Sequence, residues 1–192
     1  MKLSLPIGNR ELYLAAKWNN KQKMCYGMTN RAVVNQQCVG YVPFCDYDDS
    51  SKEEVLELWG RLIVGHGLGD TYFFKTRADG RHWQVICPSI MKLGEYCELL
   101  FESGCDRTFM GMGLMMGSWT LRIFEKDDRK EFPEPVFDAF IMAESKRPYS
   151  EAHYQFCQGY YNCPKRYIGV PIKTDLELHR FMTGNFERRK FV

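Results

Sequence analysis

Apolar residues recur at helical spacing in two segments of the chain. The first follows Ser51, which forms a capping box with Glu54, and it predicts a helix that ends in the turn-rich residues 66–70. The second predicts a helix from about residue 89 to residue 103, ended by Gly104. The expected buried stripe of this second helix is Leu93, Cys97, Leu100 and Phe101.

Other segments are short, apolar or alternating, and they are typical of strands. Residues 38–45 predict a strand that leads into an acidic cluster, and Pro43 within it indicates an edge position or a bulge. Residues 71–75 and 82–87 predict a hairpin, because the turn between them contains Asp-Gly. A further strand is expected over residues 118–124.

The order of these elements is strand, helix, hairpin, helix, strand. This order predicts an α+β fold in which helices pack on one face of a mainly antiparallel sheet. Residues 1–145 are expected to form the core, and residues 146–192 a short C-terminal extension of the same domain. Within the extension, residues 150–158 and 175–182 are each expected to form a short helix.

Composition narrows the classes of protein to consider. A chain of 192 residues that is 45% hydrophobic and carries a net charge of +2 suits one globular domain. No apolar run approaches the roughly 18 residues of a membrane span, and residues 1–7 do not resemble a secretory signal. The sequence therefore predicts a soluble intracellular protein without a membrane partner, in the cytoplasm or associated with the nucleoid.

Eight cysteines raise the question of zinc or disulfides. No two of them form a Cys-x-x-Cys pair, and without a secretory signal the thiols are expected to be reduced. His153, Cys157 and Cys163 could together supply three ligands to a structural Zn²⁺. Their spacing is not diagnostic, and burial of cysteine as a small apolar residue is the alternative.

The acidic cluster after residue 45 is the first candidate for chemistry. On a strand, Asp46 and Asp48 would project from the same face, while Cys45 and Tyr47 point to the other. Two adjacent carboxylates both ionise readily only with a cation between them, and hard oxygen ligands suit Mg²⁺ or Mn²⁺. The alternative is a solvated turn that caps the next helix, which is the role expected of Asp49.

A second candidate lies where the hairpin's second strand begins. His82 could face the same side as the aspartates, and its imidazole or the guanidinium of Arg81 could donate to a phosphate oxygen. Alternatively, the hairpin backbone satisfies the histidine.

Two more charged residues follow the second helix. Asp106 stands where a strand is expected to begin, and Arg122 interrupts an otherwise apolar strand. A charge in such a strand needs a partner, a ligand or solvent. Arg122 would therefore face either the aspartates, and with them a triphosphate, or the solvent.

In this order, these segments resemble the motifs of the archaeo-eukaryotic primase superfamily, the primase–polymerases. The first motif is an apolar strand ending in Asp-x-Asp, matched by residues 42–48. The second is matched by residues 80–82, where Gly80 stands in place of the serine of many members. The third is the single acidic Asp106, and a following arginine and lysine match Arg122 and Lys126.

The resemblance covers roughly residues 38 to 130 and implies a fold built around an RRM-like sheet. It implies that the metal ligands and catalytic residues are Asp46, Asp48 and Asp106. It also implies nucleotide contacts from Arg81, His82, Arg122 and Lys126. Its expected partners are nucleoside triphosphates, a single-stranded DNA or RNA template, and a helicase or another replication protein.

The expected function is thus a primase or polymerase that uses a two-metal Mg²⁺ or Mn²⁺ site. Two alternatives stay open. One is a nucleic-acid-binding accessory protein of the same fold without activity, and the other is a metal-dependent phosphodiesterase. The sequence contains no Walker A loop, which argues against a P-loop NTPase. It also contains no HExxH or GxSxG motif, which argues against the commonest classes of hydrolase.

Overall fold

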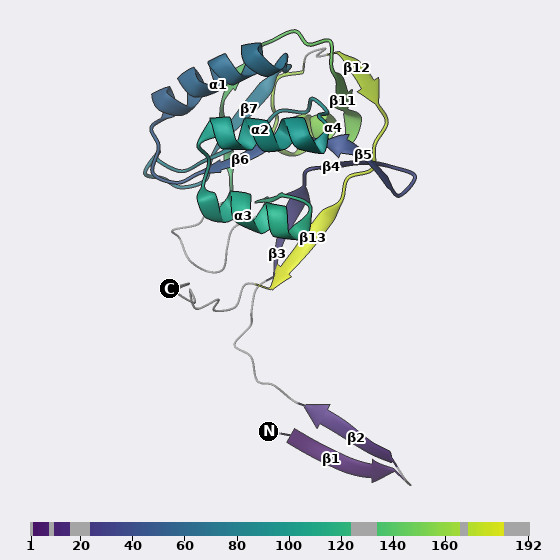
Figure 1. The fold of residues 1–192 in the computed structure, drawn as a ribbon. Helices are drawn as coiled ribbons and strands as arrows, with labels where there is room; N and C mark the ends of the chain where they lie inside the picture. Colours follow the sequence, from purple (N-terminus) through teal and green to yellow (C-terminus); the bar gives the residue numbers. More distant parts are fainter. Residues whose placement is uncertain (1, 8–9, 16–23, 124–133, 166–168, 183–192) are drawn as a thin grey trace.

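The computed structural model describes residues 2–7, 10–15, 24–123, 134–165 and 169–182. Within these ranges the chain forms four helices and mostly antiparallel sheets, which confirms the predicted α+β class (Figure 1). A central sheet separates two apolar cores, one on each of its faces. No helix in the described ranges is both long and apolar enough to cross a bilayer.

The central sheet has four antiparallel strands in the order β10-β7-β8-β6. They are β6 (Phe44–Tyr47), β7 (Thr71–Lys75), β8 (Trp83–Ile86) and β10 (Val136–Ile141). The hairpin of β7 and β8 confirms the two strands predicted around the Asp-Gly turn. Gly80 in that turn has a φ of 70°, a left-handed conformation that favours glycine.

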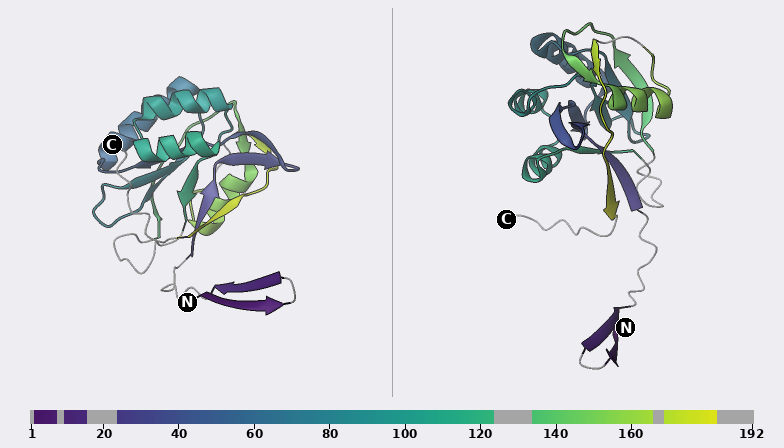
Figure 2. Two further views of the ribbon diagram at one scale, coloured as in Figure 1. Left: turned by 60° about the horizontal axis from the view of Figure 1, so that its bottom comes forward. Right: turned by 90° about the vertical axis from the view of Figure 1, so that its right-hand side faces the viewer.

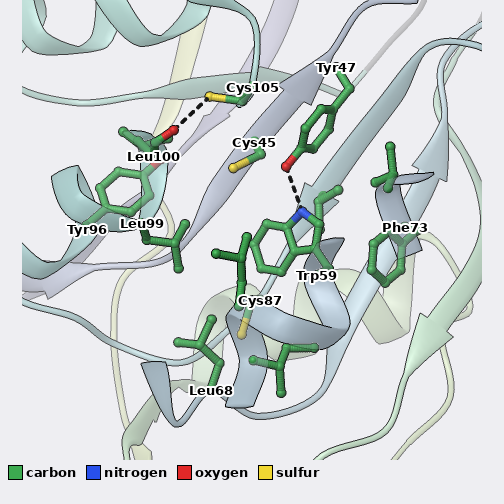
Figure 3. Packing of buried hydrophobic residues seen from close by; sticks show 14 of the residues in the cluster. Cys45, Tyr47, Trp59, Leu68, Phe73, Cys87, Tyr96, Leu99, Leu100 and Cys105 are labelled. Carbon is green, nitrogen blue, oxygen red and sulfur yellow. Dashed lines mark hydrogen bonds between the residues drawn. The ribbon is translucent and has the colours of Figure 1, made fainter. Parts of the chain in front are cut away.

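Helices from the middle of the chain cover one side of this sheet (Figure 2). They are α1 (Lys52–His66), α2 (Leu93–Ser103) and α3 (Arg107–Met116). The core beneath them contains Trp59 and Tyr96 from the helices, together with Cys45 and Tyr47 from β6 (Figure 3). Trp59 Nε1 donates a hydrogen bond to Tyr47 Oη at 2.9 Å, so neither buried polar group lacks a partner.

The other side of the central sheet is covered by α4 (Glu151–Tyr160) and by a second, three-stranded sheet in the order β13-β3-β9. That sheet consists of β3 (Met24–Thr29), β9 (Thr120–Arg122) and β13 (Leu178–Met182). The core here joins Phe44 and Phe74 of the central sheet to Leu121 of β9 and Cys157 of α4. Helices therefore flank both faces of the sheet, whereas the sequence predicted them on one.

The remaining strands form smaller pairs. Two are antiparallel hairpins and one is a parallel pair. They are β1 (Lys2–Ile7) with β2 (Arg10–Ala15), β4 (Arg31–Val34) with β5 (Gln37–Tyr41), and β11 (Pro148–Ser150) with β12 (Val170–Ile172).

Both predicted helix boundaries that rest on caps are confirmed. Ser51 and Glu54 form the reciprocal capping box of α1, and Gly104 ends α2 in the left-handed conformation. The predicted stripe of α2 is partly wrong, since Leu93 and Phe101 are exposed. The buried residues of α2 are Tyr96, Leu99, Leu100 and Ser103. Periodicity alone did not distinguish the two stripes, because both carry apolar residues spaced by three or four positions.

Three predicted elements need correction. Residues 38–45 contain the end of β5 and the start of β6, separated at Pro43, which cannot donate a ladder hydrogen bond. Asp106 precedes a helix and not a strand, because its side chain caps α3. Residues 178–182 form β13 and not a helix, because they pair with β3.

The segment after residue 145 is packed into the fold. His153 and Cys157 of α4 are buried, and β13 forms an outer strand of the second sheet. The C-terminal segment therefore contributes to the same apolar core as β6 and β7.

Candidate functional site

The candidate site begins at the end of β6. Cys45 and Tyr47 point into the helix-covered core (Figure 3), so Asp46 between them projects from the opposite face. Asp46 is half-buried, and Asp48, just beyond the end of the strand, is exposed. The structure thus places Asp46 away from its two apolar neighbours, as the alternation in the sequence predicted.

Asp106 lies beside Asp46, although the two are 60 positions apart in the sequence. Its backbone N–H donates to the carbonyl oxygen of Asp46 at 2.8 Å, which joins the start of α3 to the outer edge of β6. Its carboxylate also caps α3, accepting from the backbone N–H of Phe109 at 2.7 Å. One Asp106 oxygen therefore has a structural role that the sequence did not predict.

The charges around Asp46 show which groups gather here. Burial, followed by the negative charges of Asp48 and Asp106, raises the pKa of Asp46 to about 7. The guanidinium groups of Arg122 and Arg77 act in the opposite direction and lower this pKa. Three carboxylates and two guanidinium groups thus lie within electrostatic reach of one another. Of the two orientations open to Arg122 in the sequence, the structure favours the one toward the aspartates.

His82 bridges two carboxylates. Its Nδ1 lies 2.7 Å from Oδ1 of Asp48, and its Nε2 lies 3.3 Å from Oδ2 of Asp79. His82 therefore faces the aspartate side, and carboxylates take the place of the backbone partners that were the alternative. In this arrangement the imidazole orients Asp48.

Arg81 and Lys126 are not brought to this cluster by the described contacts. The guanidinium Nε of Arg81 lies 2.7 Å from Oδ1 of Asp49, and both side chains are largely exposed. Asp49 has a φ of 65° and belongs to the turn before α1, consistent with its exclusion as a ligand. Lys126 lies outside the described residues.

In the described part of the chain, no group of three or more His, Cys, Asp or Glu side chains is already arranged to hold a metal ion. The donor set nevertheless suits a hard divalent cation, because carboxylate oxygens are the ligands that Mg²⁺ and Mn²⁺ prefer. Besides burial, the negative charges of Asp48 and Asp106 raise the pKa of Asp46, so these carboxylates repel one another when ionised. A cation bound there would relieve this repulsion.

The structure gives His153 partners other than zinc. Its Nδ1 lies 2.5 Å from Oγ of Ser150, and its Nε2 lies 2.8 Å from the carbonyl oxygen of Thr29. Burial lowers the pKa of His153 to about 4, so the ring is neutral at pH 7. Both ring nitrogens are thereby engaged, and Cys157 and Cys163 nearby are packed as buried apolar residues.

Sequence reasoning missed two residues near the cluster. Arg77 lies in the turn between β7 and β8, where its charge reaches Asp46, and no pattern in the sequence distinguished it from other turn residues. Gln84 is paired directly with Asp46 across β8 and β6 and is buried. Its position two residues after His82 was a usable signal, because alternation places both on one face.

Compared with known proteins, the chain matches no protein-family model, no curated protein and no solved structure.

Proposed function

We propose that this protein is a metal-dependent nucleotidyltransferase, a primase or polymerase that adds nucleotides from nucleoside triphosphates on a single-stranded template. One observation carries the proposal. The carboxylates of Asp46, Asp48 and Asp106 gather with the guanidinium groups of Arg122 and Arg77 at the end of one strand. Acidic groups for cations beside basic groups for phosphates are what this reaction needs.

Each part of the cluster has a role in this proposal. The three carboxylates would hold Mg²⁺ or Mn²⁺, and the cation would compete with the proton on Asp46, whose pKa is about 7. A divalent metal held there would supply activation of a 3′-hydroxyl and stabilisation of the leaving pyrophosphate. Arg122 and Arg77 bind the triphosphate and offset the charge that develops as the bond to pyrophosphate breaks. His82 positions Asp48 through their 2.7 Å contact.

The finer features of the sequence resemblance belong to the same proposal. They are an RRM-like arrangement of the central sheet, nucleotide contacts from Arg81 and Lys126, and a helicase or another replication protein as partner. The central sheet has the antiparallel order β10-β7-β8-β6, with Asp46 on the outer strand β6. His82 directly precedes the adjacent strand β8. This order is compatible with that arrangement.

A second candidate is a nucleic-acid-binding protein of the same fold that lacks activity. It is favoured because two of the proposed metal ligands already have partners within the protein: Asp48 contacts His82, and Asp106 caps α3. On this alternative the carboxylates have structural partners only.

Extension of a primed template with Mn²⁺ or Mg²⁺, together with synthesis of a dinucleotide without a primer, tests the proposal. We expect product from the wild type and none from the double variant Asp46→Asn, Asp48→Asn. Asp175→Asn, at an exposed aspartate between β12 and β13, is the control that removes the same kind of charge. Template binding without product supports the second candidate, and template cleavage without triphosphates indicates a phosphodiesterase.

Asp106 allows its two roles to be separated. Asn caps helices about as well as Asp, whereas Ala costs about 1 kcal/mol at such a position. We therefore expect Asp106→Asn to keep the stability of the fold but to weaken Mn²⁺ binding, measured by calorimetry. Asp106→Ala should both destabilise the fold and weaken Mn²⁺ binding. Equal Mn²⁺ affinity in the wild type and Asp106→Asn would remove Asp106 from the proposed ligands.

A further inference from the structure

A row of directly paired residues crosses the central sheet from the acidic cluster to an aromatic group. Asp46 pairs with Gln84, Gln84 with Phe74, and Phe74 with Phe137. Directly paired residues on neighbouring strands point to the same face, and neighbouring strands are about 4.8 Å apart. Asp46 and Phe74, two strands apart, are therefore separated by roughly 10 Å along this face.

The aromatic group lies at the C-terminal end of α4. The ring of Tyr161 packs on that of Phe74, with centroids 4.5 Å apart and planes tilted by 47°. Tyr160 and Phe156 meet Tyr161 edge-on, at 4.9 and 5.7 Å. The hydroxyl of Tyr160 donates to Glu134 Oε1 at 2.6 Å, which holds this ring in place. Tyr161 is half-buried, so its neighbours position it without enclosing it.

Arg122 links the acidic and aromatic ends of the row. It lies on β9, on the side of the central sheet that Asp46 and Tyr161 share. Its charge acts on both residues, since it lowers the pKa of Asp46 and opposes the rise in the pKa of Tyr161 that burial causes.

We propose that Tyr161 contacts the base of the nucleoside triphosphate whose phosphates lie at Arg122 and Asp46. The inference rests on the proposed function and adds a residue from the C-terminal segment to the site. Asp46 and Phe74 are separated by roughly 10 Å, which suits a ligand with phosphates at one end and a flat ring at the other. Aromatic side chains stack on any base, so this contact favours nucleotides over bare polyphosphate.

The test compares two ligands in the full-length protein with Mn²⁺: ATP and inorganic tripolyphosphate, measured by titration calorimetry. Loss of a stacking residue is expected to weaken ATP binding about tenfold and to change tripolyphosphate binding by less than about twofold in Tyr161→Leu. Arg122→Gln should weaken the binding of both ligands. Tyr154→Leu is the matched control on α4, because Tyr154 packs on Tyr149 with centroids 5.2 Å apart. It should leave both affinities unchanged.

Several outcomes would overturn the inference while leaving the proposed function intact. They are unchanged ATP binding in Tyr161→Leu, an equal loss for both ligands, or loss of binding to a single-stranded oligonucleotide with ATP binding unchanged. The last result would assign the ring to the template. A wild type that binds neither ligand would refute the proposed function, and the inference with it.

A second measurement uses only the wild-type protein and so does not depend on the stability of a variant. Photolabelling with 8-azido-ATP and Mn²⁺ should modify the tryptic peptide of residues 147–165, which contains Tyr161. Excess ATP should suppress this labelling. Labelling confined to other peptides would exclude the base from Tyr161.

Discussion

Replacement of Asp46 by asparagine is expected to stabilise the metal-free protein at alkaline pH. An aspartate ordinarily ionises near pH 3.8, whereas burial and two neighbouring carboxylates raise the pKa of Asp46 in the fold to about 7. The folded state thus holds a proton that the unfolded state has released, so stability falls as pH rises between these two values and is constant above them. An uncharged asparagine side chain at this position would carry no such penalty.

The magnitude follows from the two pKa values. They differ by about 3, and each pKa unit corresponds to about 1.4 kcal/mol, which gives an upper limit of about 4 kcal/mol. Asp46 reaches solvent, which screens part of this penalty, so we expect Asp46→Asn to gain about 2 kcal/mol at pH 8 and almost nothing at pH 4. For a chain of this length, about 2 kcal/mol corresponds to a rise in Tm of roughly 4–8 °C.

The assay is urea unfolding in EDTA at several values between pH 4 and pH 8, with Asp175→Asn as the control for loss of one negative charge. Addition of Mn²⁺ at pH 8 should stabilise the wild type, by about 2.7 kcal/mol at a hundred times its Kd, and should stabilise Asp46→Asn far less. A stability difference between wild type and Asp46→Asn that is the same at pH 4 and pH 8 would refute the reasoning. In that case neither burial nor the neighbouring carboxylates would raise the pKa of Asp46.

Two further predictions concern the cores. In the Asp46→Asn background, the free energy of unfolding should fall by about 2 kcal/mol from pH 7.5 to pH 5. The reason is that the pKa of His153 is lowered to about 4 in the fold, so near pH 6.5 only the unfolded state gains the proton. Urea titrations that show no fall would contradict this. Gly113→Ala should cost about 1–3 kcal/mol in the same assay, since its Cβ would overlap the indole ring of Trp119. Gly111→Ala on the same helix meets nothing within 4 Å and should be neutral or stabilising, so equal effects of the two substitutions would exclude close packing at Gly113.

Local patterns in the sequence were enough to predict several elements. The capping box of Ser51 and Glu54 and the left-handed cap at Gly104 depend on groups only a few residues apart, and both were predicted. The strand ending at Asp46 and the hairpin of β7 and β8 were also predicted, because alternation and an Asp-Gly turn are local signals.

Patterns failed where two local structures fitted the same residues. Residues 178–182 were expected to be helical, but pairing with β3 makes them a strand, and that partner lies about 150 positions away. Asp106 was expected to start a strand, whereas its side chain caps α3. Tertiary pairing outweighs local propensity in the first case, and a polar side chain next to free backbone N–H groups favours a helix start in the second.

For the acidic pair, the sequence by itself determined that Asp46 projects away from Cys45 and Tyr47, because the side-chain period of a strand is two. Only the tertiary structure decided what surrounds that carboxylate. A backbone hydrogen bond brings Asp106 to the edge of β6, and the pairing of β9 with β3 places Arg122 on the same side. Both depend on chain segments that meet only when the sheets and helices pack, and such contacts leave no local period in the sequence.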